Sequence, residues 1–153
     1  MKNFQRDGAT SNTQVGRDFE EVARAYFLRA EGINLQGNFS VEIGAASTTK
    51  KSRRFDLGSE EPATLVECKS HRWTETGNMP SAKVTVWNES MFYFYLAPNH
   101  YRKVLFVIRD VHPRRTESLA EYYIRNYSHL IPAGVSIVEF DEVSGTAKVF
   151  NQL

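Results

Sequence analysis

Three ionisable residues stand at the ends of two short apolar segments. Glu67 and Lys69 follow the segment Thr64–Val66, and Asp56 follows Phe55 in the segment before it. Burying a charge is costly unless the charge is paired or binds a metal. These three residues therefore form either a structural ion pair with a neighbour or a reaction centre.

The spacing of these residues suits a site for a divalent cation. Side chains alternate along a strand, so Glu67 and Lys69 would share one face, and the backbone carbonyl of Cys68 would lie between them. Asp56 precedes Glu67 by eleven positions, enough for a tight turn and a neighbouring antiparallel strand. Two carboxylates and a carbonyl are ligands for a hard cation such as Mg²⁺. A lysine beside them can position or deprotonate an attacking water, which fits displacement at a phosphodiester.

The elements that must position these residues can be read from hydrophobic periodicity. An apolar stripe predicts a first helix from Val15 to Gly32, and its members are Phe19, Val22, Ala23, Tyr26, Phe27 and Ala30. Two further helices are predicted, one over residues 81–97 and one after the capping-box pair Ser118 and Glu121, stopped by Pro132. The predicted strands are Phe39–Ile43, Arg54–Leu57, Thr64–Lys69, Val104–Ile108, Val135–Phe140 and Thr146–Phe150. Residues 45–54 are expected to form a polar, basic hairpin loop, and the aromatic residues Phe92–Tyr95 to lie in the core.

The order α-β-β-β-α-β-α-β-β predicts a single α/β domain with a mixed sheet. We expect this domain to span residues 14–153, after a flexible N-terminal arm over residues 1–13. Hydrophobic residues make up 41% of the chain and charged residues 24%, which is ordinary for a globular domain. The net charge of +1 excludes a histone-like polycation, so any contact with nucleic acid must come from local clusters of basic residues.

The single cysteine, Cys68, excludes an internal disulfide and a cysteine-rich zinc site. The N-terminus does not resemble a signal peptide, and the apolar-aromatic cluster Met91–Ala97 is too short to span a bilayer. We therefore expect a soluble, cytoplasmic protein.

The acidic and basic residues also resemble a known motif. Asp56, ten intervening residues and then Glu67-Cys68-Lys69 are similar to the motif of the PD-(D/E)XK nuclease superfamily, which has the restriction-endonuclease-like fold. The segment Gly16–Gly32 resembles the first helix of the resolvase-like and Mrr-like branches, where Gly-x-x-x-Glu places a glutamate near the metal. That glutamate would be Glu20.

The resemblance covers residues 16 to about 108 and includes the αβββαβ order of the family. Two departures are visible. Phe55 replaces the proline that precedes the aspartate, and no Gln-x-x-x-Tyr follows on the next helix, which disfavours the RecB-like exonuclease branch.

This resemblance implies a Mg²⁺-dependent endonuclease that acts on DNA, with Mn²⁺ as a substitute, and leaves 5′-phosphate and 3′-hydroxyl ends. Asp56, Glu67 and the Cys68 carbonyl would hold the metal, Lys69 would activate the water, and Glu20 would be an auxiliary ligand. Glu20 could equally be a plain surface carboxylate, since it lies at the edge of the apolar stripe. A homodimer is compatible with this class. The alternative is a non-catalytic module that binds nucleic acid or serves assembly, and keeps the fold. Retention of every motif residue favours the enzyme.

Basic and aromatic residues near the motif are candidate DNA contacts, because phosphate contacts dominate affinity for nucleic acid. These are Lys50, Lys51, Arg53, Arg54, Arg72, Trp73 and Lys83. Trp73 could stack on a base. The first four could instead form a solvated hairpin tip. His71 shares the face of Lys69 if the strand continues that far, and could then contact a phosphate or donate a proton. A plain loop residue is the other interpretation of His71.

Overall fold

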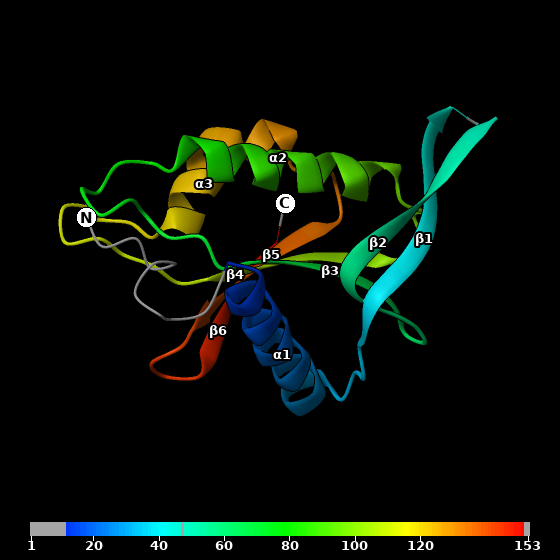
Figure 1. The fold of residues 1–153 in the computed structure, drawn as a ribbon, viewed down its shortest axis with the longest axis horizontal. Helices are drawn as coiled ribbons and strands as arrows, with labels where there is room; N and C mark the ends of the chain where they lie inside the picture. The colour runs from blue at the N-terminus through cyan, green and yellow to red at the C-terminus, as the bar shows by residue number, and fades with distance from the viewer. Residues whose placement is uncertain (1–11, 47, 152–153) are drawn as a thin grey trace.

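A mixed sheet forms the middle layer of this computed structural model, which describes residues 12–46 and 48–151 (Figure 1). Its strands in these residues are β1 (Gln36–Ala46), β2 (Thr49–Glu60), β3 (Ala63–Lys69), β4 (Arg102–Ile108), β5 (Val135–Asp141) and β6 (Thr146–Asn151). They lie side by side in sequence order. Strands β3, β4 and β5 are parallel to one another, whereas the other neighbouring pairs are antiparallel.

Three α-helices in the described residues cover the two faces of the sheet. Helix α1 (Asn12–Glu31) packs on one face, and α2 (Ser81–Leu96) and α3 (Leu119–Tyr127) lie on the other (Figure 1). Each face has its own buried cluster, with Phe27 and Phe106 on the α1 side and Trp87 and Leu105 on the α2 side. The predictions of a single α/β domain, a mixed sheet and this order of elements are confirmed.

Helix α1 buries part of the predicted stripe. Phe19, Ala23 and Phe27 are buried, whereas Val22 is 37% exposed at the edge of the stripe. The helix ends as predicted before Gly32, whose φ of +67° is a left-handed conformation that glycine adopts easily. The predicted arm over residues 1–13 lies outside the described residues, apart from positions 12 and 13, which belong to α1.

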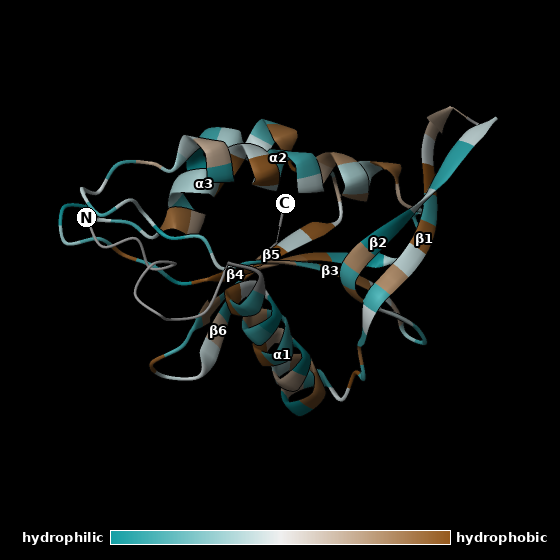
Figure 2. Ribbon diagram, viewed as in Figure 1, coloured by the Kyte–Doolittle hydropathy of each residue, from teal (hydrophilic) through white to brown (hydrophobic). Residues whose placement is uncertain are grey.

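The hairpin of β1 and β2 corrects the prediction of a loop over residues 45–54. Strand β2 already begins at Thr49, so the basic residues belong to a long two-stranded ribbon that extends beyond the helices (Figure 1). Figure 2 shows that β2 is hydrophilic toward the end of this ribbon. Polar composition suggested a loop, but an exposed ribbon needs only one apolar face. Strand β1 supplies that face through the buried Val41 and Ile43, which pair with Arg53 and Lys51.

The prediction that the aromatic run of α2 lies in the core is wrong in part. Phe94 is fully buried, whereas Phe92 is 56% and Tyr95 is 68% exposed. A helix turns consecutive residues in different directions, so a run of adjacent aromatic residues cannot share one buried face. The predicted bounds of this helix are confirmed within one residue.

The start of α3 is confirmed, but its end is not. Ser118 and Glu121 form the predicted capping box, with reciprocal hydrogen bonds of 3.0 and 3.2 Å. The α-helix ends at Tyr127, and the short 3₁₀ turn Ser128–Leu130 fills the space before Pro132. Within residues 12–46 and 48–151, no helix combines the length and the apolar character needed to cross a membrane.

Candidate active site

Strands β2 and β3 separate at the predicted acidic residues. Their described pairing ends at Leu57 and Val66, and Asp56 is the next residue of β2. Phe55 packs in the cluster on the α2 side, whereas Leu57 packs in the cluster on the α1 side. Residues two apart in a regular strand share a face. The chain of β2 therefore rotates at Asp56, and its carboxylate lies in the fork between the two strands.

Asp56 holds the two strands together across this fork. Its Oδ2 accepts a hydrogen bond of 2.8 Å from the backbone N–H of Cys68. A side-chain oxygen thus replaces the backbone carbonyl that a regular ladder would supply. In a strand, the N–H and C=O of one residue point to the same side. The carbonyl of Cys68 therefore also faces β2, as the cation hypothesis requires.

The thiol of Cys68 is turned away from the fork. It packs against the cluster on the α1 side. Burial, followed by the charges of Asp56, Glu20 and Glu67, raises the pKa of the thiol well above its usual value. A partly buried thiol that stays protonated is a poor nucleophile.

Glu67 is the most deeply buried acid of the motif, with 1% exposure. Burial, and then the charge of Asp56 and a side-chain hydrogen bond with Asp56, raise the pKa of Glu67 to about 8. Two carboxyl groups share a hydrogen bond only when one of them holds a proton. Lys69 and Arg53 lower the pKa of Glu67, but burial and Asp56 outweigh them. The fork therefore favours an additional positive charge.

Two cations already contact Glu67 from the α2 side. Lys69 Nζ lies 3.8 Å from Oε2 of Glu67, and Arg53 Nη2 lies 3.1 Å from Oε1. The Lys69 side chain is 14% exposed, so it reaches the surface from the same face of β3 as Glu67. The guanidinium of Arg53 also lies over the ring of Tyr93, 3.9 Å from its centre. No sequence pattern indicates these contacts of Arg53, since they join three separate elements.

Helix α1 brings Glu20 close to the fork. Glu20 is partly buried, and its pKa is raised by that burial first and then by the charges of Asp56 and Glu21. Arg17 and Arg24 oppose this effect. The charges of Glu20 and Asp56 therefore act on each other, although α1 and β2 are far apart in the sequence.

The oxygen donors at the fork fit a hard divalent cation. Among the described residues, no three His, Cys, Asp or Glu side chains gather closely enough to hold a metal by themselves. The donor set is instead mixed, with the carboxyl groups of Asp56 and Glu67 and the carbonyl of Cys68. These are the oxygen ligands that Mg²⁺ and Mn²⁺ prefer. A bound cation would offset the burial and the charge of Asp56, which together raise the pKa of Glu67.

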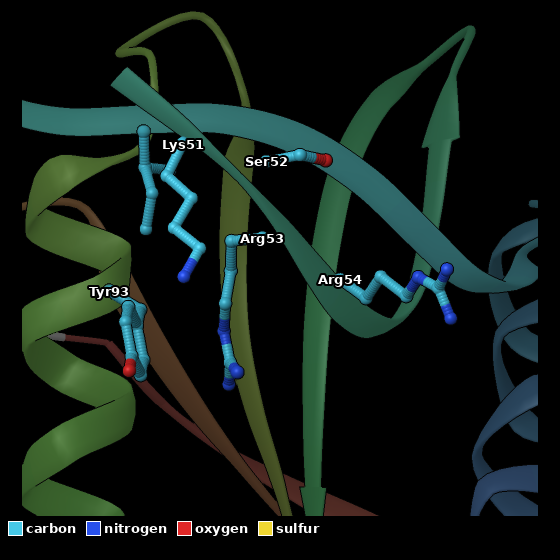
Figure 3. A pocket seen from close by; sticks show the side chains of 6 residues that line it. Lys51, Ser52, Arg53, Arg54 and Tyr93 are labelled. Atoms are coloured by element: carbon cyan, nitrogen blue, oxygen red, sulfur yellow. The ribbon is translucent and has the colours of Figure 1, made fainter. Parts of the chain in front are cut away.

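The four basic residues of β2 divide between two faces. Lys51 and Arg53 lie on the α2 side beside Tyr93 and line a pocket of about 240 Å³, which Figure 3 shows from close by. Arg54 also lines this pocket, but its side chain points away from Tyr93 (Figure 3). Lys50 is exposed and belongs to the opposite face, because strand side chains alternate. Lys51 and Arg53 therefore lie on the same side of the sheet as the Glu67 and Lys69 side chains.

Two of the predicted DNA contacts, Arg72 and Trp73, lie in the loop after β3 and bind other residues of the fold. Trp73 is 6% exposed, and both its backbone N–H and its Nε1 donate to Asp110, at 2.9 and 3.1 Å. Arg115 covers its ring, with 4.2 Å to the ring centre. The expectation that Trp73 stacks on a base is not supported by this packing. Arg72 is paired with Asp110 at 3.3 Å and with Glu142 at 2.7 Å. Lys83, by contrast, is exposed in the first turn of α2.

Glu139 is a buried acid that the sequence reasoning missed. It is 2% exposed, pairs with Arg109 at 3.0 Å, and leaves Oε2 without a partner in the described part of the chain. The register aligns Lys69 with Val107 and Val107 with Glu139, so Glu139 lies two strands from Lys69 on the same face. The signal that singled out Glu67, an acid within an apolar strand, is equally present in β5.

No family model, curated protein or solved structure matches this chain. The resemblance to the PD-(D/E)XK superfamily therefore depends on the motif residues Asp56, Glu67 and Lys69, on the segment Gly16–Gly32 and on the αβββαβ order of elements. What the structure adds is the geometry of the fork and the chemistry of the groups that line it.

Proposed function

We propose that this protein is a metal-dependent endonuclease that hydrolyses DNA phosphodiester bonds to 5′-phosphate and 3′-hydroxyl ends. The observation that carries this proposal is the fork itself. The carboxyl groups of Asp56 and Glu67 meet there, with Lys69 Nζ 3.8 Å from Glu67. In this proposal, α1-β1-β2-β3-α2-β4 is a restriction-endonuclease-like core, and two copies of the chain would act together to cut both strands of a duplex.

Each residue at the fork then has a distinct task. Asp56, Glu67 and the Cys68 carbonyl would hold Mg²⁺, with Glu20 as an auxiliary ligand. When bound, the cation would stabilise the negative charge that develops on the phosphodiester. Nζ of Lys69 would orient the water that attacks phosphorus, and the 3′-oxygen would leave.

The test is cleavage of supercoiled plasmid, single-stranded and branched DNA with Mg²⁺, Mn²⁺ or EDTA. We expect cleavage of at least one substrate with either metal, and none in EDTA. The ends of the product should accept ligation directly, since ligation requires 5′-phosphate and 3′-hydroxyl groups. Cleavage that continues unchanged in EDTA would contradict metal dependence.

A specific observation favours a second candidate, the non-catalytic module that binds nucleic acid or serves assembly. Both oxygens of Glu67 already have cationic neighbours, Arg53 and Lys69, so the three residues can also be interpreted as a closed structural network. The same assay separates the candidates. A module would bind DNA with an affinity indifferent to metal, and would cut none of the substrates.

The ribbon of β1 and β2 provides a prediction about DNA binding. Replacing Lys50, Lys51 and Arg54 together with alanine should weaken binding of duplex DNA. It should also lower the salt dependence of log K by about 0.9 for each phosphate that the variant no longer neutralises. Arg53 is left in place, because its loss would also remove a partner of the buried Glu67. Each exposed substitution should change the free energy of unfolding by no more than about 0.5 kcal/mol.

Binding can be followed by fluorescence anisotropy across a salt series. Lys148→Ala is the matched control, since Lys148 lies on β6, at the opposite edge of the sheet from the ribbon, and is exposed. If the triple variant kept the wild-type salt dependence, these residues would be a solvated surface and not a DNA contact.

A further inference from the structure

His71 is held in one tautomer by a contact with α2. Nε1 of Trp87 lies 3.0 Å from Nδ1 of His71. An indole N–H can only donate a hydrogen bond, so Nδ1 must accept it and carries no proton. The proton of the neutral imidazole is therefore on Nε2.

The side chain of Trp87 that imposes this tautomer is fixed in the core. Trp87 is fully buried, and its ring packs against Tyr123, with 5.0 Å between the ring centres. The hydroxyl of Tyr123 in turn donates to Asn88, at 2.8 Å. Burial, followed by the charges of Lys69 and Lys83, lowers the pKa of His71 to about 4. The ring is thus neutral at physiological pH.

The protonated nitrogen of His71 is available to a ligand. The two ring nitrogens point in divergent directions, so Nε2 is directed away from Trp87. His71 as a whole is half-buried. In the described residues, Nε2 is not one of the side-chain atoms that are both buried and without a hydrogen-bond partner. His71 cannot act as a general base here, because the lone pair of Nδ1 is engaged and Nε2 already holds a proton.

The groups around His71 identify the chemistry of that ligand. Lys69 precedes it by two residues, and Lys83 comes from the first turn of α2; the charges of both act on the imidazole. In the part of the chain that the structure describes, no carboxylate forms an ion pair with Lys83. Lys69 and Lys83 supply two cations, and the N–H of His71 has no acceptor among the described residues. Together these groups favour an anion with several oxygen atoms.

We infer that His71 is a neutral hydrogen-bond donor, locked as the Nε2–H tautomer by Trp87, to a non-bridging phosphate oxygen of the DNA backbone beside Lys69. Lys83 supplies the positive charge for the same phosphate. This inference deepens the proposed function and rests on it. Trp87 is a positioning residue in this arrangement, since it acts only through His71.

The tautomer can be tested directly on the full chain. Nitrogen NMR of ¹⁵N-histidine-labelled protein at pH 7 should show His71 with an unprotonated Nδ1 and a protonated Nε2. A short DNA duplex, added in EDTA to prevent cleavage, should shift the Nε2 resonance. In Trp87→Phe the lock is absent, and the Nδ1–H form should become populated. Protonation of Nδ1 in the wild-type protein would overturn the inference.

Salt dependence distinguishes a neutral donor from a cation. In His71→Asn, the amide oxygen can still accept from Trp87 while the Nε2–H donor is absent. We expect duplex affinity about tenfold lower, because a hydrogen bond to a charged group is removed, with an unchanged salt slope. Lys83→Ala should lower both the affinity and the slope, the latter by about 0.9. His129→Asn, an exposed histidine in the 3₁₀ turn after α3, is the control and should match the wild type.

The outcomes separate this inference from the proposed function. If the wild-type protein binds duplex and His71→Asn binds equally well, His71 does not contact phosphate and only the inference fails. A reduced salt slope in His71→Asn would also overturn it, since the contact would then be ionic. If the wild-type protein neither binds nor cuts DNA, the proposed function fails and the inference fails with it.

Discussion

Lys69→Met should cut DNA about 100-fold more slowly than the wild-type protein, or worse, while folding and DNA binding stay nearly intact. The loss is the usual scale when a positioned group that orients or transfers a proton is removed. Methionine preserves most of the apolar stem, so packing on β3 changes little. The Asp56 and Glu67 carboxyl groups remain, and the metal should bind as well as before or more tightly, since a nearby positive charge is gone.

Three measurements on the same preparations make this test decisive. They are the single-turnover cleavage rate with saturating Mg²⁺, the duplex affinity in EDTA, and the melting temperature. Lys148→Met is the control, an exposed lysine on β6 that should cut at the wild-type rate. Lys69→Ala should behave like Lys69→Met. A Lys69→Met protein that melts normally and still cuts at the wild-type rate would remove Lys69 from the site. Activity that falls only with the folded fraction would make Lys69 a structural partner of Glu67.

Glu67→Gln should stabilise the metal-free protein at high pH, although it removes a motif residue. The pKa of Glu67 is raised from 4.5 to about 8 in the folded protein. Between these two values the folded state keeps a proton that the unfolded state releases. The free energy of unfolding therefore falls as pH rises through this window, and the full penalty is present above pH 8. Glutamine is neutral at every pH and escapes this penalty.

The expected difference is on the order of 3 kcal/mol in favour of Glu67→Gln at pH 9, and close to zero at pH 5. The full shift would correspond to somewhat more, but glutamine also gives up the attraction of Arg53 and Lys69. Urea denaturation in EDTA across pH 5–9 measures the effect. Glu42→Gln, an exposed glutamate of β1, should leave the pH dependence unchanged. The Glu67→Gln protein should also be unable to cleave DNA. A variant less stable than the wild type at pH 9 would show that the ion pairs of Glu67 outweigh its burial.

Much of the fold could be predicted from the sequence, because its elements follow local rules. The helical stripe of α1, the capping box at Ser118 and the apolar run of β4 each depend on residues within one segment. The extent of β2 could not be predicted in this way. Its basic residues have the composition of a loop, and only the pairing with β1, which contributes the apolar Val41 and Ile43, makes this segment a strand.

In the candidate site, too, only the features that depend on a single segment could be predicted from the sequence. The alternation of Glu67 and Lys69 on β3 follows from strand geometry, and the structure places them on one face, 3.8 Å apart. The rotation of β2 at Asp56 has no local signal, since it depends on two clusters on opposite faces of the sheet. The same holds for the lock of His71 by Trp87, which joins residues of different elements. The sequence suggested that Trp73 could stack on a base, whereas in the structure Trp73 is buried by its contacts with Asp110 and Arg115.

In the proposed function, the Asp56 side chain has two separate roles. Its carboxylate accepts a hydrogen bond from the Cys68 N–H, and it would also bind the metal. An oxygen at position 56 stabilises the fold, because its loss would leave that N–H without its partner, at a cost of about 1–3 kcal/mol. A loss of that size can lower the amount of folded protein in a cell several-fold. Asparagine would supply the oxygen without the charge. Asparagine at position 56 would therefore keep this contact of the fold and remove the charge that the proposed metal site needs, whereas an apolar residue there would remove both.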